Sequence, residues 1–192
     1  MFYVFPIDTK DSYDRFCYFE AAFTKEECER IVEHTEPLPY VDATVGMNES
    51  ILDPSVRKSK LKWIWFNQET AWIFAKLQEL VLGANKNRYG FNLSGFFESL
   101  QYTEYDSSRS HYDWHQDHGS GEHSRRKLSL VIQLSPSESY RGGVLELYGC
   151  SEIPNSQGTV IIFPSYEMHR VTPVVDGTRS SLVAWVTGPA FQ

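Results

Sequence analysis

The second half of the chain is a series of short stretches suited to β-strands, separated by turn sequences. Turn-rich pieces such as residues 119–121, 155–158 and 176–177 punctuate it. Parallel strands need a crossover connection of about a dozen residues or more, usually a helix, and the gaps between the later strands are too short for one. We therefore expect short strands, joined without crossover helices, at 96–105, 111–117, 127–134, 143–149, 158–163, 169–174 and 179–187.

The first half of the chain carries two helical patterns. Thr24 and Glu27 form a capping box, which predicts a helix at about 25–34. A second helix is expected at about 68–82, with Asn67 as its cap and an apolar stripe along one face. These helices lie before the strand-rich part of the chain, so they are expected to pack on one face of a sheet rather than to alternate with the strands.

The order of these elements predicts the fold class. Residues 37–60 are expected to be a loop region with a strand or two. We expect a mainly β protein with flanking helices (α+β), a double-stranded β-helix or jelly roll buttressed by the N-terminal helices. The chain is expected to be a single domain, 1–192, with 1–90 as a helical and loop support region and 91–192 as the double-stranded β-helix.

Composition and charge exclude several classes of function. With 41% hydrophobic residues the chain has enough apolar material for a packed core, so global disorder is excluded. Its 18 basic and 25 acidic residues give a net charge of −7, which disfavours nucleic acid and anionic membranes as partners and would suit a basic peptide. Three scattered cysteines without a CxxC motif indicate a reducing compartment, and the N-terminus resembles neither a signal peptide nor a membrane span. We therefore expect a cytoplasmic protein.

Histidines followed two residues later by an acid are the strongest chemical pattern in the sequence. Three such pairs occur, namely His34/Glu36, His111/Asp113 and His115/Asp117. The first lies at a helix end, where residues two apart do not share a face. The other two lie in one expected strand, where residues two apart point the same way. The spacing alone does not decide between these two pairs.

The surroundings of these pairs resemble a known family. The chain resembles the Fe(II)/2-oxoglutarate-dependent dioxygenases, and within them the prolyl 4-hydroxylase-like branch. The match covers residues 96–188, with a softer echo in the first helix and in residues 57–59. The ordered segments that carry it are 112–117, 126–134, 141–147, 158–165, 169–179 and 181–185.

This resemblance implies a metal site. His115 and Asp117 would be iron ligands from one strand, and His169 would be the third from a strand across the barrel. Two imidazoles and one carboxylate form the facial triad of non-haem Fe(II) oxygenases, which leaves positions open for a bidentate 2-oxo acid and dioxygen. His111 and Asp113 are the alternative pair, which we expect to be bystanders.

The resemblance also implies a co-substrate site. Arg179 would grip the distal carboxylate of 2-oxoglutarate. A three-residue hairpin loop at 175–177 would pair 169 with 183 and turn both His169 and Arg179 inward. The remaining carry-overs are Trp185 as an inward catalytic aromatic near the metal, and Tyr105, Gln133 and Leu145 as further cofactor-binding positions.

The function implied is hydroxylation of a proline in a peptide or protein, with release of succinate and CO2. The implied cofactors are Fe(II), 2-oxoglutarate and O2, with ascorbate as reductant. The alternatives are the same chemistry on a free amino acid, another side chain or a nucleic-acid base, and a non-catalytic jelly-roll binding module. The related nucleic-acid demethylases carry a second arginine where this chain has Trp185. Loops at 37–60, 106–111 and 118–125 would select the substrate.

Overall fold

The computed structural model describes residues 14–43, 53–150 and 152–190. Its helices are α1 (Lys25–Thr35) and α2 (Ala71–Ala84), the latter continued by a π-turn at Asn85–Tyr89. Short 3-10 turns occupy Gly121–Arg125 and Ser137–Ser139. The strands are β1 (Cys17–Phe19), β2 (Val41–Asp42), β3 (Arg57–Lys58), β4 (Lys60–Ile64), β5 (Leu100–Asp106), β6 (His111–His115), β7 (Arg126–Gln133), β8 (Tyr140–Gly142), β9 (Leu145–Leu147), β10 (Val160–Pro164), β11 (His169–Val171) and β12 (Val174–Thr187).

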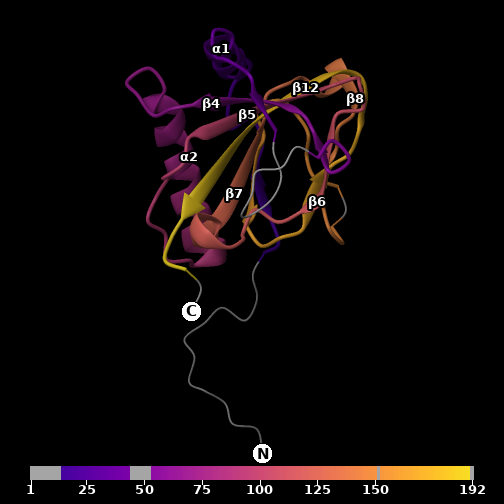
Figure 1. Ribbon diagram of the computed structural model, residues 1–192. Helices are drawn as coiled ribbons and strands as arrows, with labels where there is room; N and C mark the ends of the chain where they lie inside the picture. Colours follow the sequence, from indigo (N-terminus) through magenta and orange to yellow (C-terminus); the bar gives the residue numbers. More distant parts are fainter. Residues whose placement is uncertain (1–13, 44–52, 151, 191–192) are drawn as a thin grey trace, which may run out of the picture.

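The strands form two sheets. The larger sheet has the order β1-β10-β7-β12-β5-β4-β2, with β8 paired to β12, and the smaller has the order β3-β6-β11-β9. Among the described residues, the paired strands of both sheets run antiparallel to each other. In Figure 1, α2 lies along one side of the strands β5, β7 and β12, while β6 lies on the opposite side of the molecule. The expected jelly roll buttressed by N-terminal helices is confirmed.

Alternation along the central strands divides the interior into two apolar regions. In β7, Leu128, Leu130 and Ile132 belong to the core between the large sheet and the helices. Val131, on the opposite face of the same strand, packs in a second cluster between the two sheets. Successive side chains of a strand point to opposite faces, so a strand buried on both sides is apolar along most of its length. All eight residues of β7 are buried.

The same alternation in β12 turns a set of polar and aromatic side chains toward the smaller sheet. Leu182, Ala184 and Val186 belong to the helix-side core. The odd-numbered positions of the same strand from 179 to 185 line a cavity between the sheets. They are Arg179, Ser181, Val183 and Trp185. Strand β12 therefore lies between the apolar core on the helix side and a cavity lined by polar and aromatic side chains.

The first expected helix is confirmed, and the second is displaced. Both hydrogen bonds of the Thr24–Glu27 capping box are present at the start of α1. The second helix begins at Ala71 rather than at 68, because the side chain of Asn67 caps the preceding turn by accepting from the backbone N–H groups of Glu69 and Thr70. It also runs beyond 82, through the π-turn, and ends at Gly90 in the left-handed conformation.

The expected hairpin loop at 175–177 is wrong. Residues 176 and 177 lie within β12, whose first part pairs with β8, and β11 pairs with β9 and β6 instead. His169 and Arg179 therefore come from different sheets. Gly177 adopts a φ of +71°, and a Cβ atom there would lie 2.1 Å from the carbonyl oxygen of Ser139. The glycine serves a close approach of two strands rather than a turn.

Three strands were not expected from the sequence. Strand β1 extends the large sheet beyond β10, β4 pairs with β5 over five residues, and β8 pairs with the first part of β12. Strands β2, β3 and β4 all come from the N-terminal region, which therefore contributes to both sheets as well as supporting them with helices. Strand β3 pairs with β6 in the smaller sheet, which brings Arg57 to the cavity.

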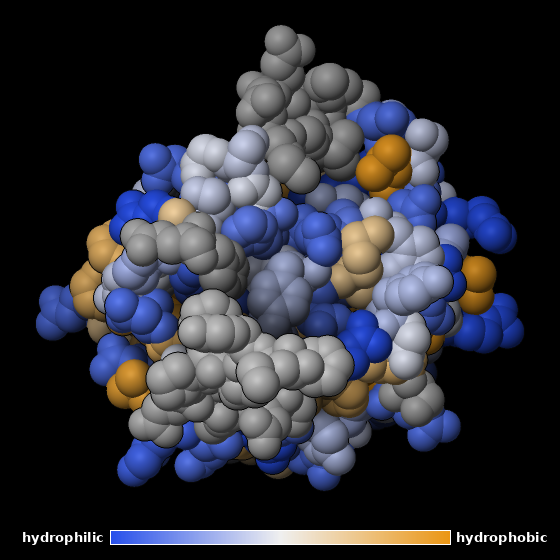
Figure 2. All heavy atoms as spheres, turned by 90° about the horizontal axis from the view of Figure 1, so that it is seen from below, coloured by the Kyte–Doolittle hydropathy of each residue, from blue (hydrophilic) through white to orange (hydrophobic). Residues whose placement is uncertain are grey.

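Among the described residues, each helix is too short or too polar to cross a bilayer. Figure 2 shows that the face seen from below is largely hydrophilic where it is coloured, with hydrophobic residues in small separate groups.

A glycine substitution tests the packing of the loop before β10 against the segment before α1. Gly158 has a φ of +80°, and a Cβ atom there would lie 1.9 Å from the carbonyl oxygen of Phe23. We expect Gly158→Ala to lower the free energy of unfolding by about 1–3 kcal/mol in urea denaturation, because the backbone becomes strained. The matched control is Gly83→Ala in α2, where a Cβ atom meets no heavy atom within 4 Å. Equal stability of the two variants would contradict this packing.

Candidate functional site

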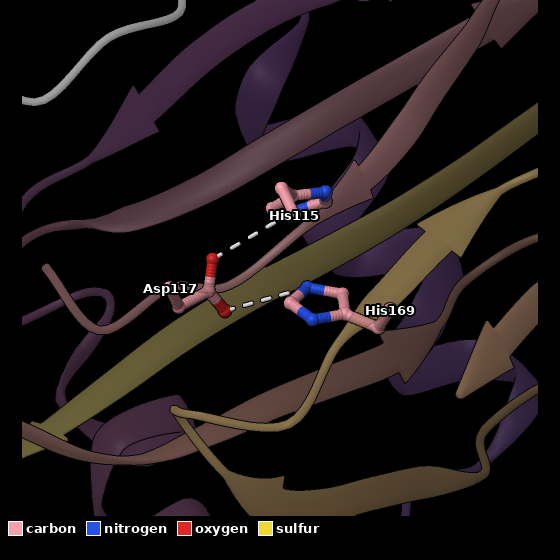
Figure 3. A group of neighbouring side chains, drawn as sticks. All are labelled: His115, Asp117 and His169. Carbon is pink, nitrogen blue, oxygen red and sulfur yellow. Dashed lines mark ion pairs between the residues drawn. The ribbon is translucent and has the colours of Figure 1, made fainter. Parts of the chain in front are cut away.

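Three side chains from the smaller sheet and the loop after it converge at one point. Nε2 of His115 lies 3.8 Å from Oδ1 of Asp117, and Nε2 of His169 lies 3.6 Å from Oδ2 of the same carboxylate. All three potential ligand atoms lie within 4.8 Å of one another. Figure 3 shows both imidazoles directed toward the Asp117 carboxylate. The structure thus brings together the three residues that the sequence resemblance assigned to iron.

The local strand geometry explains this convergence. His115 ends β6 and His169 begins β11, and these two residues are direct cross-strand partners. The expectation that His169 comes from across the barrel is therefore wrong, because its strand is the neighbour of β6. The expected strand 111–117 ends at His115, and Asp117 lies beyond it, where its backbone N–H donates to the carbonyl of Ser165. This turn aims the carboxylate back at the two imidazoles.

Hydrogen bonds to the backbone orient both imidazole rings. Nδ1 of His115 lies 2.7 Å from the carbonyl oxygen of Asp113, and Nδ1 of His169 lies 2.9 Å from that of Glu167. A carbonyl oxygen only accepts, so each Nδ1 carries the proton and each Nε2 presents its lone pair to the Asp117 side. Orientation of a metal-binding imidazole through its second nitrogen is a recurring feature of metal sites.

Burial and neighbouring charge set the ionisation of the three groups. Burial lowers the pKa of His115, and the proximity of His169 lowers it further. For Asp117, burial favours the neutral acid, but the facing imidazoles of His169 and His115 more than offset it and hold the pKa of the carboxyl below its usual value. A carboxylate and neutral imidazoles are the states that a metal requires of these ligands.

Ser129 supports the carboxylate and was missed by the sequence analysis. Its Oγ donates to Oδ2 of Asp117 at 2.6 Å and lies 3.0 Å from Oγ of Ser165. Ser129 interrupts the apolar run of β7 on the face turned toward the cavity. A polar residue between Leu128 and Leu130, in a strand expected to be buried, was the signal that could have identified it.

The donor set fits a non-haem ferrous ion. Two imidazole nitrogens and one carboxylate are the ligands of the Fe(II) oxygenases that leave coordination positions open. The alternative pair does not take part. Both ring nitrogens of His111 lie near backbone carbonyls, those of Arg109 and Ser55, and Asp113 is exposed, with Oδ1 accepting from the backbone N–H of Trp114.

The cavity next to the triad has a volume of about 560 Å³ and lies between the two sheets. Arg179 lines it with only 1% of its surface exposed. Nη2 of Arg179 donates to Oε1 of Gln133 at 2.9 Å, and Nη1 lies 3.4 Å from Oγ of Ser181. Its Nε has no hydrogen-bond partner among the described residues, and none of the ion pairs found there includes Arg179. A buried guanidinium without a carboxylate fits an anionic ligand supplied from outside.

Gly143 makes room for this guanidinium. It has a φ of +60°, and a Cβ atom there would lie 3.0 Å from Cδ of Arg179. The ring of Tyr105, which is the cross-strand partner of Arg179, lies 5.5 Å from the guanidinium carbon. Leu145 also lines the cavity, whereas Gln133 reaches it only through its contact with Arg179.

Aromatic residues form another part of the wall. Trp185 is 5% exposed and its ring centre lies 6.4 Å from that of Trp63. The guanidinium carbon of Arg126 lies 3.9 Å from the Trp185 ring, and Glu98 pairs with this arginine through two hydrogen bonds. Nε1 of Trp185 is buried and has no partner among the described residues. The expected inward position of Trp185 is what the structure shows.

Comparison with known proteins agrees with this geometry. Residues 100–187 match the family model described as the 2OG-Fe(II) oxygenase superfamily. A PKHD-type hydroxylase of Synechococcus sp. strain CC9902 is 38% identical over 78 residues, which cover 39% of this chain and 35% of that protein. The match thus spans about a third of the length of that relative.

Two solved structures share the fold. A prolyl-4-hydroxylase from Pseudomonas putida superposes with a TM-score of 0.69 and 18% identity, covering 92% of this chain and 94% of the other. A prolyl hydroxylase from Trichoplax adhaerens, solved in complex with a peptide fragment of the hypoxia inducible factor oxygen degradation domain, gives a TM-score of 0.68 and 16% identity, covering 90% of this chain and 83% of the other. At these identities the likeness establishes the fold.

The two His–x–Asp pairs make a matched test of the metal site. We expect Asp117→Ala to abolish tight binding of Fe(II), or of Mn(II) as a substitute, in a calorimetric titration, because the carboxylate that faces both imidazoles is lost. Asp113→Ala removes an exposed carboxylate two residues before His115 and should leave the affinity unchanged. The reverse result would place the metal at the other pair.

Proposed function

We propose that this chain, whose residues 100–187 match the family model of the 2OG-Fe(II) oxygenase superfamily, is an Fe(II)- and 2-oxoglutarate-dependent dioxygenase. We propose that it hydroxylates a proline in a peptide or protein and releases succinate and CO2. The observation that carries the proposal is the presence, in one cavity, of the His115–Asp117–His169 cluster and a buried guanidinium that lacks a carboxylate partner among the described residues. The cluster would hold the metal that binds one end of a dicarboxylate, and the guanidinium would bind the carboxylate at its other end.

In this proposal His115, Asp117 and His169 hold the iron. When bound, ferrous iron with 2-oxoglutarate and dioxygen supplies the oxidising power to insert one oxygen atom into a C–H bond of the substrate. The protein holds the ligands in the right tautomer through the Asp113 and Glu167 carbonyls and keeps Asp117 ionised with the help of Ser129.

Arg179 would bind the distal carboxylate of 2-oxoglutarate. Gln133 fixes one of its nitrogens and leaves Nε free for the ligand. Tyr105 lies beside the guanidinium, and burial raises the pKa of its phenol, so that it remains a hydrogen-bond donor at neutral pH. Leu145 would form an apolar wall for the methylene groups, and Trp185 would contact the substrate on the opposite side.

Proline as the target rests on the names of the structural relatives. One is called a prolyl-4-hydroxylase and another was solved with a peptide fragment bound. Our proposal includes ascorbate as reductant, a cytoplasmic location, and no nucleic-acid or membrane partner. It also treats 1–192 as one domain, in which 1–90 supports the catalytic part 91–192. A free amino acid, another side chain or a nucleic-acid base remains the alternative substrate.

Succinate release tests the reaction and its substrate class together. We expect the Fe(II)-loaded protein to convert 2-oxoglutarate to succinate faster with proline-containing peptides than with methylated oligonucleotides or without a second substrate. If only free amino acids or only oligonucleotides increase succinate release, the proposed reaction stands, but the substrate is not a proline-containing peptide. Absence of succinate in every reaction, with iron bound, would favour the non-catalytic binding module.

A matched pair of arginine variants tests the co-substrate anchor. We expect Arg179→Gln to raise the KM for 2-oxoglutarate by about 10- to 100-fold, because a charge-assisted hydrogen bond contributes roughly 1.5–3 kcal/mol. Its affinity for Mn(II) should stay close to that of the unmodified protein. Arg141→Gln removes the same charge at an exposed position of β8 and should change neither value. An unchanged KM in Arg179→Gln would contradict the anchor role.

A further inference from the structure

A second nearly buried guanidinium lines the same cavity, and neither the metal site nor the co-substrate anchor uses it. Arg57 begins β3, with Tyr112 of β6 as its cross-strand partner, and only 8% of its surface is exposed. Its guanidinium carbon lies 4.4 Å from the centre of the Tyr112 ring. The Tyr112 ring in turn stacks on the ring of His115, with centres 3.4 Å apart. Arg57 is therefore separated from a metal ligand by a single aromatic ring.

The polar contacts of Arg57 leave its terminal nitrogens free. Within the described residues, its side chain makes one hydrogen bond, from Nε to Oγ of Ser59 at 3.1 Å. Its Nη1 and Nη2 have no hydrogen-bond partner there, and Arg57 is one of the residues that line the cavity. None of the ion pairs of the described residues includes Arg57.

Arg126 is the informative comparison because it is exposed to the same extent and lines the same cavity. Glu98 compensates that guanidinium through two hydrogen bonds. Placing a guanidinium in a largely dry wall without a carboxylate has a desolvation cost. At Arg126 the carboxylate of Glu98 offsets this desolvation cost. At Arg57 the described residues provide no carboxylate that would do so.

The charges of the cavity wall lead to the same conclusion. Among the described residues that line the cavity, Asp117 is the only acid, whereas three arginines, Arg57, Arg126 and Arg179, carry a permanent positive charge. In the proposed complex, the ferrous ion and Arg179 balance Asp117 and the 2-oxoglutarate dianion, and Glu98 balances Arg126. Arg57 then remains as an uncompensated positive charge facing the space left for the substrate.

We infer that Arg57 binds a carboxylate of the substrate, so that this cavity takes substrates with a negative charge close to the carbon that is hydroxylated. The inference rests on the proposed function and narrows its substrate class. The carboxylate is that of an acidic side chain beside the target residue, of a peptide C-terminus, or of a free amino acid. A planar guanidinium with two free N–H edges suits all three through paired hydrogen bonds.

The test compares charged probes with their amide counterparts. The protein is loaded with Mn(II) and 2-oxoglutarate without O2, and binding is followed by calorimetry. The probe pairs are acetyl-Glu-Pro-Gly-amide and acetyl-Gln-Pro-Gly-amide, acetyl-Gly-Pro with a free carboxylate and its amide, and L-proline and L-prolinamide. We expect at least one carboxylate probe to bind about 10- to 100-fold more tightly than its amide, and the pair that discriminates identifies the source of the charge.

Arg57→Gln should bring the affinities of the discriminating pair to about the same value, and Arg57→Lys should retain part of the preference. Lys58→Gln is the matched control, because it removes the same charge from the adjacent exposed residue, whose Nζ donates to the carbonyl of Ser108. That variant should keep the full preference.

Three results would overturn the inference, and each differs from a failure of the proposed function. In the first, the loaded protein binds each carboxylate probe no more tightly than its amide, or binds none of the probes. In the second, the preference for the carboxylate probe persists in Arg57→Gln. In the third, Arg57→Gln weakens the binding of 2-oxoglutarate as strongly as Arg179→Gln does. In all three cases the unmodified protein still binds Mn(II) and 2-oxoglutarate. Failure of the loading step itself would instead contradict the proposed function.

Discussion

Burial of unbalanced charge is the constraint on which the cavity depends. Asp117 lies between two imidazoles and keeps its pKa low despite burial, and Arg179 lies almost fully enclosed with Nε unpartnered among the described residues. Each arrangement is costly in an empty, dry site and becomes favourable once a cation and a dianion fill it. The cavity thus contains two half-sites of opposite charge, the His115–Asp117–His169 cluster for a cation and Arg179 for an anion.

The fold separates these half-sites by placing them on different sheets. His115 and His169 face each other across neighbouring strands of the smaller sheet, whereas Arg179 projects from β12 of the larger one. The apolar core on the helix side stabilises the large sheet. The fold therefore does not require apolar residues at every position of the face that lines the cavity. Binding of one molecule across both sheets would stabilise their relative position as well as satisfy the charges.

Several features could be predicted from the sequence because they depend on local or linear patterns. The capping box at Thr24 and the strand expected at 127–134 depend on short-range geometry, and the triad was found through the order of several segments. The hairpin at 175–177 could not be predicted correctly, because Gly177 serves a long-range approach of β12 to Ser139. Nor could the proposed role of Arg57 be predicted, because the pairing of β3 with β6 and the absence, among the described residues, of an acid paired with its guanidinium are properties of the tertiary structure.

The most direct test of the central claim measures whether the two half-sites act on the same molecule. If one dicarboxylate spans the metal and Arg179, each must strengthen the binding of the other by the same factor. We predict that 2-oxoglutarate binds at least about tenfold more tightly to the Mn(II)-loaded protein than to the metal-free protein in calorimetric titrations without O2, and that the dicarboxylate tightens Mn(II) binding equally. Independent binding of the metal and 2-oxoglutarate would contradict the account.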